Sequence, residues 1–253
     1  MVLLEAGALR HERFVSLWGI PELRVIDTAE AALTIGALTT YTDLLKHPVV
    51  QAEFPLLCEA AAQTGGVATQ NRGTIGGNIA NASPAADTPP ALLVYDAELE
   101  LASTRGTRRV PYHRFHTGYK AMDLAADELI THVRLPRRQG WVSTYRKVGT
   151  RRAQAIAKVC FAAAAQVQEG EVKDIRIAFG SVAPTVARAM RTEQAVRGRR
   201  PDPDVLRQAL AALSGEIVPI DDVRSTARYR MSVAGRMLTA FLESLGETAT
   251  RTR

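Results

Sequence analysis

The sequence predicts an α+β protein in two domains. Its 253 residues are enough for two modest domains, and 46% of them are hydrophobic, as in ordinary globular proteins. The stretch PRRQGW, at about 137–141, separates mixed strands and helices from a part with three strands followed by helices. We therefore expect an N-terminal domain over 1–138 and a small C-terminal domain over 141–250 with a three-stranded antiparallel sheet.

In the N-terminal part, the residue pattern predicts each element in turn. Residues 24–38 indicate two short strands around a polar turn, and 41–66 indicate a helix that ends at a glycine pair, which is a C-cap signal. Residues 67–90 have a period of neither 2 nor 3.6 and therefore indicate a loop. Residues 91–103 pass from a short helix into a strand, and 128–136 indicate a strand closed by proline.

The C-terminal part is predicted as strands and then helices. The strands are expected at 143–149, 155–168 and 172–183, and the first two helices at 185–198 and 202–213. The last helix, about 226–245, has the clearest pattern. Its apolar residues recur at steps of three and four on one face: Met231, Ala234, Met237, Leu238, Phe241, Leu242 and Leu245. This stripe is expected to face the core or a partner and not to form a site.

Composition argues against several classes of function. No apolar run approaches about 20 residues, so no membrane span is expected, and the first residues lack the pattern of a secretory signal. Cys58 and Cys160 stand far apart in apolar surroundings, as expected for buried free thiols of a cytoplasmic protein. Two isolated cysteines cannot hold an iron–sulfur cluster or a structural zinc, so metal chemistry would lie on another chain.

The net charge of +6 is compatible with a nucleic-acid partner. The arginines are scattered, however, and no basic run is interleaved with aromatic residues. A solvated basic surface, or a docking face for an acidic protein, is therefore the preferred interpretation, and no nucleic acid is expected as a partner.

The stretch NRGTIGGNIANASPAADTPPALL, residues 71–93, is unusually polar and rich in glycine for mid-chain. Gly76 and Gly77 allow a sharp turn and the close approach of a bulky polyanion, and successive N–H groups there can form an anion nest. Polar side chains surround the pair: Thr74, Asn78, Ser83 and Asp87. Donors for phosphate, with the Asp87 carboxylate as an acceptor for hydroxyls, indicate a dinucleotide cofactor. A tight glycine turn with helix caps is the alternative interpretation.

The same stretch resembles the flavin-binding signature of the FAD subunit of molybdenum hydroxylases, a family that includes xanthine dehydrogenases and carbon monoxide dehydrogenase. Other segments along nearly the whole chain follow in the family's order: IGALTTYTDLL, FHTGYKAMDLAADELI, YRKVGTRRAQAIAKV, IAFGSVAPTVARA and DDVRSTARYR. The resemblance implies an FAD-binding domain of the vanillyl-alcohol-oxidase type, shortened at its N-terminus, followed by the small C-terminal domain.

The resemblance also implies which residues bind FAD. The loop that grips the pyrophosphate matches Thr74, Ile75, Gly76, Gly77 and Asn78. Asp87 would bind flavin-side hydroxyls, with Ser83 beside it. An apolar side chain near the isoalloxazine would come from Ile130 or Leu129, and Lys158 would stabilise negative charge on reduced flavin. Ile130 as an ordinary core residue and Lys158 as a surface cation stay open. No catalytic residue and no metal ligand is assigned.

One family feature has no counterpart in this sequence. The resemblance implies a second flavin loop of the form A-G-G-T-D-L, and Met1 stands where the residues directly after that loop would begin. Either a longer product begins upstream, or the subunit is truly shortened. A shortened subunit would lose hydrogen bonds to phosphate worth about 1.5–3 kcal/mol each. Ala155, at a position where many members have aspartate, favours the xanthine-dehydrogenase-like branch.

The family implies electron relay. A large subunit with molybdopterin hydroxylates the substrate, a second subunit carries [2Fe–2S] clusters, and the FAD subunit passes electrons on to NAD+, a quinone or oxygen. We therefore expect a cytoplasmic oxidoreductase subunit of a heterotrimer, alone or dimerised. The alternative is a scaffold that binds flavin weakly or not at all and docks the partners without electron transfer.

Overall fold

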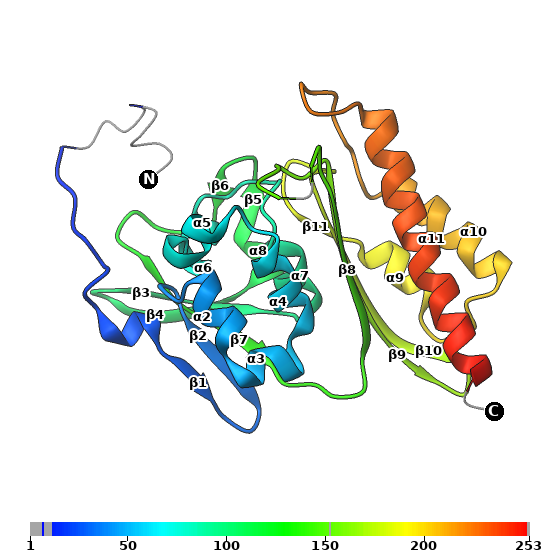
Figure 1. Cartoon of the computed structure of the whole chain (residues 1–253), viewed down its shortest axis with the longest axis horizontal. Coiled ribbons are helices and arrows are strands. Elements are labelled where there is room, and N and C mark those ends of the chain that lie inside the picture. Colours follow the sequence, from blue (N-terminus) through cyan, green and yellow to red (C-terminus); the bar gives the residue numbers. More distant parts are fainter. Residues whose placement is uncertain (1–6, 8–11, 152, 252–253) are drawn as a thin grey trace.

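The structure, a computed structural model, describes residue 7, residues 12–151 and residues 153–251, with side chains as far as residue 246. Two antiparallel sheets lie side by side, with helices between them and on the outer face of the second sheet (Figure 1). The mixed α+β class is therefore confirmed. The expectation about the segment at Met1 lies outside the described residues.

The N-terminal sheet has the strand order β1-β2-β7-β3-β4. Leu33 and Ile35 of β2 pair with Leu135 and Val133 of β7, and all four are fully buried, so one face of the sheet carries the core. Its strands are β1 (Ile26–Thr28), β2 (Ala32–Gly36), β3 (Glu98–Ser103), β4 (Gly106–Pro111) and β7 (Leu129–Pro136). A separate two-stranded ribbon consists of β5 (His116–Gly118) and β6 (Ala121–Met122). The predicted β1, β2, β3 and β7 are confirmed.

Short helices cover the buried face of this sheet. They are η1 (Pro21–Arg24), α2 (Tyr41–Lys46), α3 (Pro48–Glu53), α4 (Pro55–Ala62), α5 (Val67–Arg72), α6 (Ile75–Ala80), α7 (Pro89–Val94) and α8 (Tyr112–Phe115). The single helix predicted over 41–66 is wrong because Pro48 and Pro55 each begin a new helix. The loop predicted over 67–90 is also wrong, since it contains α5 and α6. Each has six residues, too few to display a helical period.

The C-terminal sheet has the order β11-β10-β9-β8, so the predicted three strands gain a two-residue edge strand. The strands are β8 (Val142–Val148), β9 (Val159–Gln168), β10 (Glu171–Gly180) and β11 (Ala187–Arg188). Their outer face packs on α9 (Met190–Val196), α10 (Pro203–Ser214) and α11 (Ala227–Arg251). The apolar stripe of α11 is buried or half-buried in this core. Of the two expectations for the stripe, the core is therefore the one that the structure supports. Within the described residues, every helix is too short or too polar to cross a membrane.

The two sheets share one continuous interior. Along β9, Val159 and Phe161 face the outer helices, whereas the small residues Cys160, Ala162 and Ala164 face the N-terminal part. Small side chains on that face leave room for α7, whose six residues are all buried and which packs on β9 and β10. The segment between β7 and β8 holds the predicted domain boundary, which stays a prediction.

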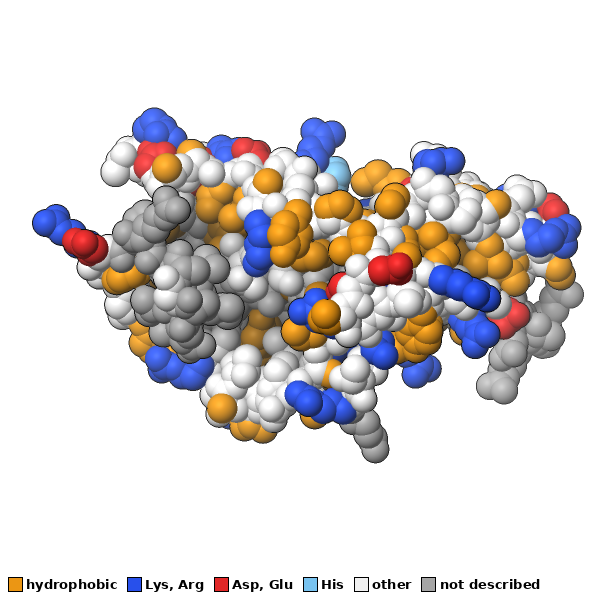
Figure 2. Space-filling view, turned by 90° about the horizontal axis from the view of Figure 1, so that it is seen from above, with side chains coloured by type: hydrophobic (Ala, Val, Ile, Leu, Met, Phe, Trp, Pro, Cys, Tyr) orange, Lys and Arg blue, Asp and Glu red, His pale blue; other side chains and the backbone are white. Residues whose placement is uncertain are grey.

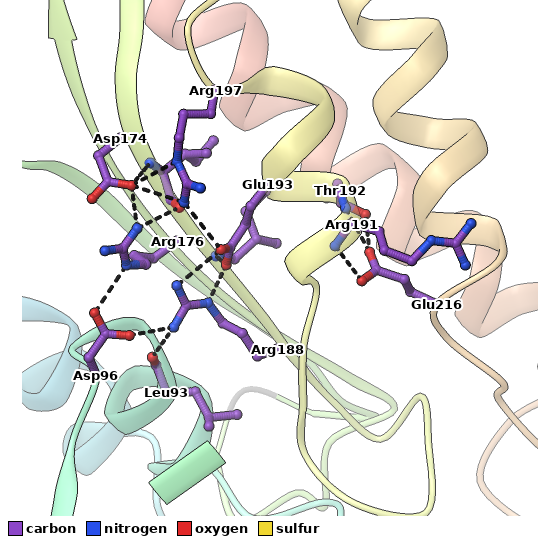
Figure 3. Close-up of polar contacts among 12 residues, drawn as sticks. Leu93, Asp96, Asp174, Arg176, Arg188, Arg191, Thr192, Glu193, Arg197 and Glu216 are labelled. Carbon is purple, nitrogen blue, oxygen red and sulfur yellow. Dashed lines mark hydrogen bonds and ion pairs between the residues drawn. The ribbon is translucent and has the colours of Figure 1, made fainter. Parts of the chain in front are cut away.

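A cluster of ion pairs crosses the same junction (Figure 3). Arg188 of β11 lies between Asp96, which follows α7, and Glu193 of α9. Its Nη1 also donates to the carbonyl oxygen of Leu93, at the C-terminal turn of α7. One buried cation thus ties α7 to the C-terminal sheet and its helices.

Candidate functional site

The glycine-rich stretch forms the start of α6. Thr74 is the N-cap residue, with extended φ and ψ of −118° and 155°, and its hydroxyl accepts a hydrogen bond of 3.1 Å from the Gly77 N–H. The Ile75 side chain is fully buried and fixes this helix end to the core. The local sequence T-I-G-G therefore combines a cap, an anchor and an exposed glycine at Gly77.

Gly76 is required by a close contact. A Cβ atom at this position would lie 2.6 Å from Cβ of Ala37 and 2.8 Å from its carbonyl oxygen. The Gly76 N–H donates to that same oxygen at 2.8 Å, and the Ile75 N–H donates to the Thr39 carbonyl at 3.0 Å. The start of α6 is thus joined backbone to backbone with the segment that follows β2.

The expected row of free N–H groups is not formed here. The N–H groups of Ile75, Gly76, Gly77 and Asn78 all donate within the protein, the last one to the Thr74 carbonyl at 3.0 Å. The physical reason is the cap itself, because the Thr74 side chain and the Ala37–Thr39 carbonyls take the donors of the first turn. Any phosphate contact would have to share the exposed Gly77 N–H or use side-chain groups.

Asp87 lies in the turn between α6 and α7 and is 8% exposed. Its Oδ2 lies 2.8 Å from Nζ of Lys147, and its carbonyl oxygen accepts a hydrogen bond of 3.0 Å from the Tyr145 hydroxyl. Its Oδ1 is buried and has no hydrogen-bond partner among the described residues. Burial raises the pKa of the Asp87 carboxyl to about 6, although Lys147 acts in the opposite direction.

The residues around Asp87 connect its turn with α6. The hydroxyl of Thr88, the next residue, donates to Oδ1 of Asn78 at 2.8 Å. The Tyr41 hydroxyl lies near both groups: burial raises its pKa, the Asp87 carboxylate raises it further, and the Asn78 amide opposes them. Tyr41 was not predicted from the sequence. Its place in IGALTTYTDLL, directly after the N-cap Thr40, offered no signal beyond its position in that segment.

The other predicted N-terminal residues occupy different environments. Ser83 is half-buried, and its Oγ accepts a hydrogen bond of 3.3 Å from the Ala85 N–H in the turn before Asp87. Ile130 of β7 is 8% exposed and belongs to the core that also holds Ile79 of α6. Its neighbour Leu129 is 46% exposed. Ile130 is therefore the residue of this pair that packs with α6.

The structure places Lys158 and Lys147 differently from each other. Lys158 precedes β9, and its Nζ lies 5.5 Å from the ring centroid of Tyr229 in α11. Lys147 of β8 points into the interior, where it pairs with Asp87 and donates to the Gln63 carbonyl at 2.8 Å. The spacing of Tyr145 and Lys147, two residues apart on a strand, puts both side chains on one face and could have indicated this.

These groups lie towards the end of the molecule at which α5, α6 and the loop between β8 and β9 meet. Figure 2 looks onto that end and shows a hollow near the middle of the face, with Lys and Arg side chains spread over the face instead of gathered in one band. The loop before β9 approaches α5, because a Cβ on Gly66 would lie 2.8 Å from Nε2 of Gln154. The start of α5 and the loop before β9 therefore lie against each other.

The residues fit a flavin dinucleotide by the chemistry of their groups. The glycine pair removes side-chain bulk at a capped helix start, and the unpartnered Asp87 oxygen is an acceptor suited to a hydroxyl. No cluster of metal-ligating side chains occurs in the part of the chain that the structure describes.

Two family models match the chain. The FAD-binding domain in molybdopterin dehydrogenase matches residues 1–138, and the C-terminal domain of the CO dehydrogenase flavoprotein matches residues 143–245. The first model alone covers more than half of the chain.

Known relatives agree with these models. The glyceraldehyde dehydrogenase medium chain of Sulfolobus acidocaldarius is 33% identical over 91% of this chain and 82% of its own length. A putative xanthine dehydrogenase FAD-binding subunit of Escherichia coli K12 is 32% identical over 90% of this chain and 79% of its own. A carbon monoxide dehydrogenase structure from Hydrogenophaga pseudoflava, which lacks the Mo-pyranopterin moiety, aligns with a TM-score of 0.84 and 34% identity over 87% of this chain and 77% of that one. This chain therefore belongs to the FAD-binding subunits of molybdopterin dehydrogenases, the flavoprotein components of xanthine-dehydrogenase-like oxidoreductases.

Proposed function

We propose that this chain holds FAD between α6 and Asp87 and relays electrons from a [2Fe–2S] cluster on a partner subunit to an acceptor such as NAD+, a quinone or oxygen. The observation that carries the proposal is the buried, unpartnered Oδ1 of Asp87 beside the capped glycine start of α6. When bound, the flavin supplies the one- and two-electron chemistry, and the protein supplies binding, orientation and electrostatics.

Each predicted residue has a role in this proposal. Gly77, which is exposed, leaves room for the pyrophosphate, and Gly76 lets the start of α6 approach Ala37 closely enough to place it. Thr74 and Asn78 offer side-chain polar groups to the pyrophosphate, while Ile75 anchors the helix start. Asp87 accepts a flavin-side hydroxyl, with Ser83 in the turn that carries it. Ile130 is proposed as an apolar neighbour of the isoalloxazine ring. Lys158 is proposed as a cation near the same ring, and its side chain, which now lies over the Tyr229 ring, would have to rotate towards the flavin.

The partners are also part of the proposal. Two of the relatives are medium chains or FAD-binding subunits by name, which supports assembly with an iron–sulfur subunit and a large molybdopterin subunit in a heterotrimer, alone or dimerised. The two free cysteines, Cys58 and Cys160, support a reducing, cytoplasmic location.

A scaffold without flavin is the second candidate. The observation that favours it is the internal pairing of the four N–H groups from Ile75 to Asn78, which leaves few donors for phosphate. On this reading the chain would dock its partners and stay colourless.

Co-production of the chain with its partner subunits separates the two candidates. The purified complex is expected to carry flavin near equimolar with this chain, and dithionite-reduced flavin should be reoxidised by NAD+, a quinone or oxygen. A complex that assembles without flavin would support the scaffold. Flavin that stays oxidised while the iron–sulfur clusters are reduced would rule out the relay.

A further inference from the structure

Asp87 and Lys147 form a buried ion pair. Nζ of Lys147 lies 2.8 Å from Oδ2 of Asp87, and the two side chains are 7% and 11% exposed. The same Nζ donates to the Gln63 carbonyl, which fixes the ammonium from a second side. The Tyr145 hydroxyl holds the Asp87 backbone at 3.0 Å. Oδ2 of Asp87 is thus held by Lys147, whereas Oδ1 has no hydrogen-bond partner among the described residues.

We propose that Lys147 is the positioning residue of the flavin site: it keeps Asp87 ionised and turned so that Oδ1 presents a bare acceptor to a hydroxyl of the ribityl chain. This inference rests on the proposed function. A buried carboxylate oxygen without a partner is costly, and such groups gather where a ligand completes them. The ion pair with Lys147 leaves little side-chain freedom to be lost on binding, which favours affinity.

A purely structural pair would also join β8 to the turn before α7. In the positioning role the charge of Lys147 also controls the protonation of Asp87, whereas a structural role requires only that the two side chains be joined. Groups that face Asp87 come from three elements: Tyr41 of α2, Tyr145 and Lys147 of β8, and Cys160 of β9. Burial raises the pKa values of Tyr41, Tyr145 and Cys160, so these three stay neutral at pH 7, and Glu59 of α4 also raises the pKa of Tyr145. Lys147 therefore supplies the charge that opposes Asp87 among these described groups.

The pKa of the Asp87 carboxyl is about 6, raised by burial and held from rising further by Lys147. A protonated carboxyl is a poorer acceptor, so FAD affinity should fall as the pH drops through that value. Without the Lys147 charge, Asp87 would take up its proton at a higher pH. The midpoint of the pH profile should then move upward, and the affinity near neutral pH should fall by about tenfold.

The test is the dissociation constant of FAD, followed by quenching of flavin fluorescence on the 253-residue chain from about pH 5 to about pH 8. Lys147→Met should show the raised midpoint and the weaker binding. Lys147→Arg, which keeps the charge, should restore the wild-type midpoint in large part. Asp87→Asn should bind more weakly and lose the pH dependence near 6.

The matched control is Lys173→Met. Lys173 pairs with Glu171 at the same 2.8 Å, but the two side chains are 44% and 41% exposed and stand outside the site. It should leave both the affinity and the midpoint unchanged. Circular dichroism and thermal melting of each variant without FAD report on the fold.

The outcomes separate the inference from the function on which it rests. A folded Lys147→Met with the wild-type affinity and midpoint would overturn the positioning role, as would an Asp87→Asn variant that keeps the pH dependence. The second result holds even if Lys147→Met does not fold. A wild-type chain that binds no FAD at any pH would instead overturn the proposed function, and this inference with it.

Discussion

Nη1 of Arg188 lies 2.7 Å from Oδ1 of Asp96, and this contact joins the edge strand β11 to the end of α7 across the junction of the two sheets. Nη2 of the same guanidinium lies 3.0 Å from Oε2 of Glu193 (Figure 3). Arg188 is 7% exposed and Glu193 only 4%. Glu193 also accepts the Ile177 N–H at 2.8 Å, so β10, β11, α7 and α9 meet in one network.

Removal of the Arg188 cation alone should therefore strongly destabilise the folded protein. Arg188→Met leaves Glu193 and Asp96 without their shared partner in the interior, and loss of one member of a buried pair costs about 3–5 kcal/mol. We expect the free energy of unfolding, measured in urea, to fall by about that amount. The double variant Arg188→Met/Glu193→Gln should recover part of the loss, because it no longer buries an uncompensated carboxylate.

An exposed pair of similar length is the control for this variant. Arg207 and Asp204 of α10 are 2.8 Å apart, with side chains 71% and 54% exposed. Arg207→Met should change the unfolding free energy by no more than about 0.5 kcal/mol. Equal losses for Arg188→Met and Arg207→Met would contradict a role for burial.

Asp96 should make the stability depend on pH in a definite direction. Burial raises the pKa of Asp96, but Arg188 and Arg176 outweigh it and hold the pKa below its ordinary value. A carboxyl with a lowered pKa in the folded state stabilises the protein above its unfolded pKa of about 3.9 and loses this effect as the pH falls through the folded value.

Asp96→Asn is the variant that tests this direction. Asparagine suits the backbone there, because Asp96 has a positive φ of 51°. At pH 7 the variant should be less stable than the wild type by about 1–3 kcal/mol. The gap, followed by urea unfolding, should close below about pH 4. A gap that grows as the pH falls would contradict the sign.

Much of the fold could be predicted because long buried segments leave a pattern in the sequence. The β2, β9 and β10 strands are rich in apolar residues and buried for most of their length, and the α11 stripe is apolar on one face. The six-residue helices α5 and α6 leave no such pattern, since fewer than two turns cannot display a period. The 41–66 segment breaks at Pro48 and Pro55, each of which begins a new helix, although apolar residues continue on both sides of the two prolines.

The candidate site shows the same division. Thr74, Gly76 and Asp87 are readable from a motif, because a cap, a close backbone contact and a polar turn each need particular residues. The partner of Asp87 is not local. Lys147 stands 60 positions later and meets Asp87 only because β8 packs beside the turn before α7. Contacts of that range depend on how the two sheets pack, which no local pattern carries.

Gly76→Ala should weaken both the fold and the site. The added Cβ would lie 2.6 Å from Cβ of Ala37 and 2.8 Å from its carbonyl oxygen, so backbone would have to move. Forced displacements of this kind typically cost about 1–3 kcal/mol. We expect that loss in urea unfolding and a raised dissociation constant for FAD. Gly118→Ala is the control, because the added Cβ would lie 3.7 Å from Cβ of Ala121, an ordinary van der Waals contact.

The two cysteines should differ in reactivity because they differ in burial. Cys160 is fully buried in β9, with Sγ 3.0 Å from the Tyr145 hydroxyl, and burial raises the pKa of its thiol to about 12. Cys58 is half-buried, and burial followed by the Glu59 charge raises its pKa as well. At pH 8 the thiolate fraction of Cys160 should be about a thousandfold below that of a free cysteine.

Alkylation with iodoacetamide and peptide mass mapping measures this difference directly. In the folded chain Cys58 should react more slowly than a free thiol, and Cys160 should stay unmodified over the same time. In urea both should react at similar rates, and Cys58→Ser isolates the Cys160 signal. Rapid modification of Cys160 in the folded chain would mean that the inner face of β9 opens to solvent. That result would contradict the packing of α7 on this face, and the same packing brings Asp87 and Lys147 together.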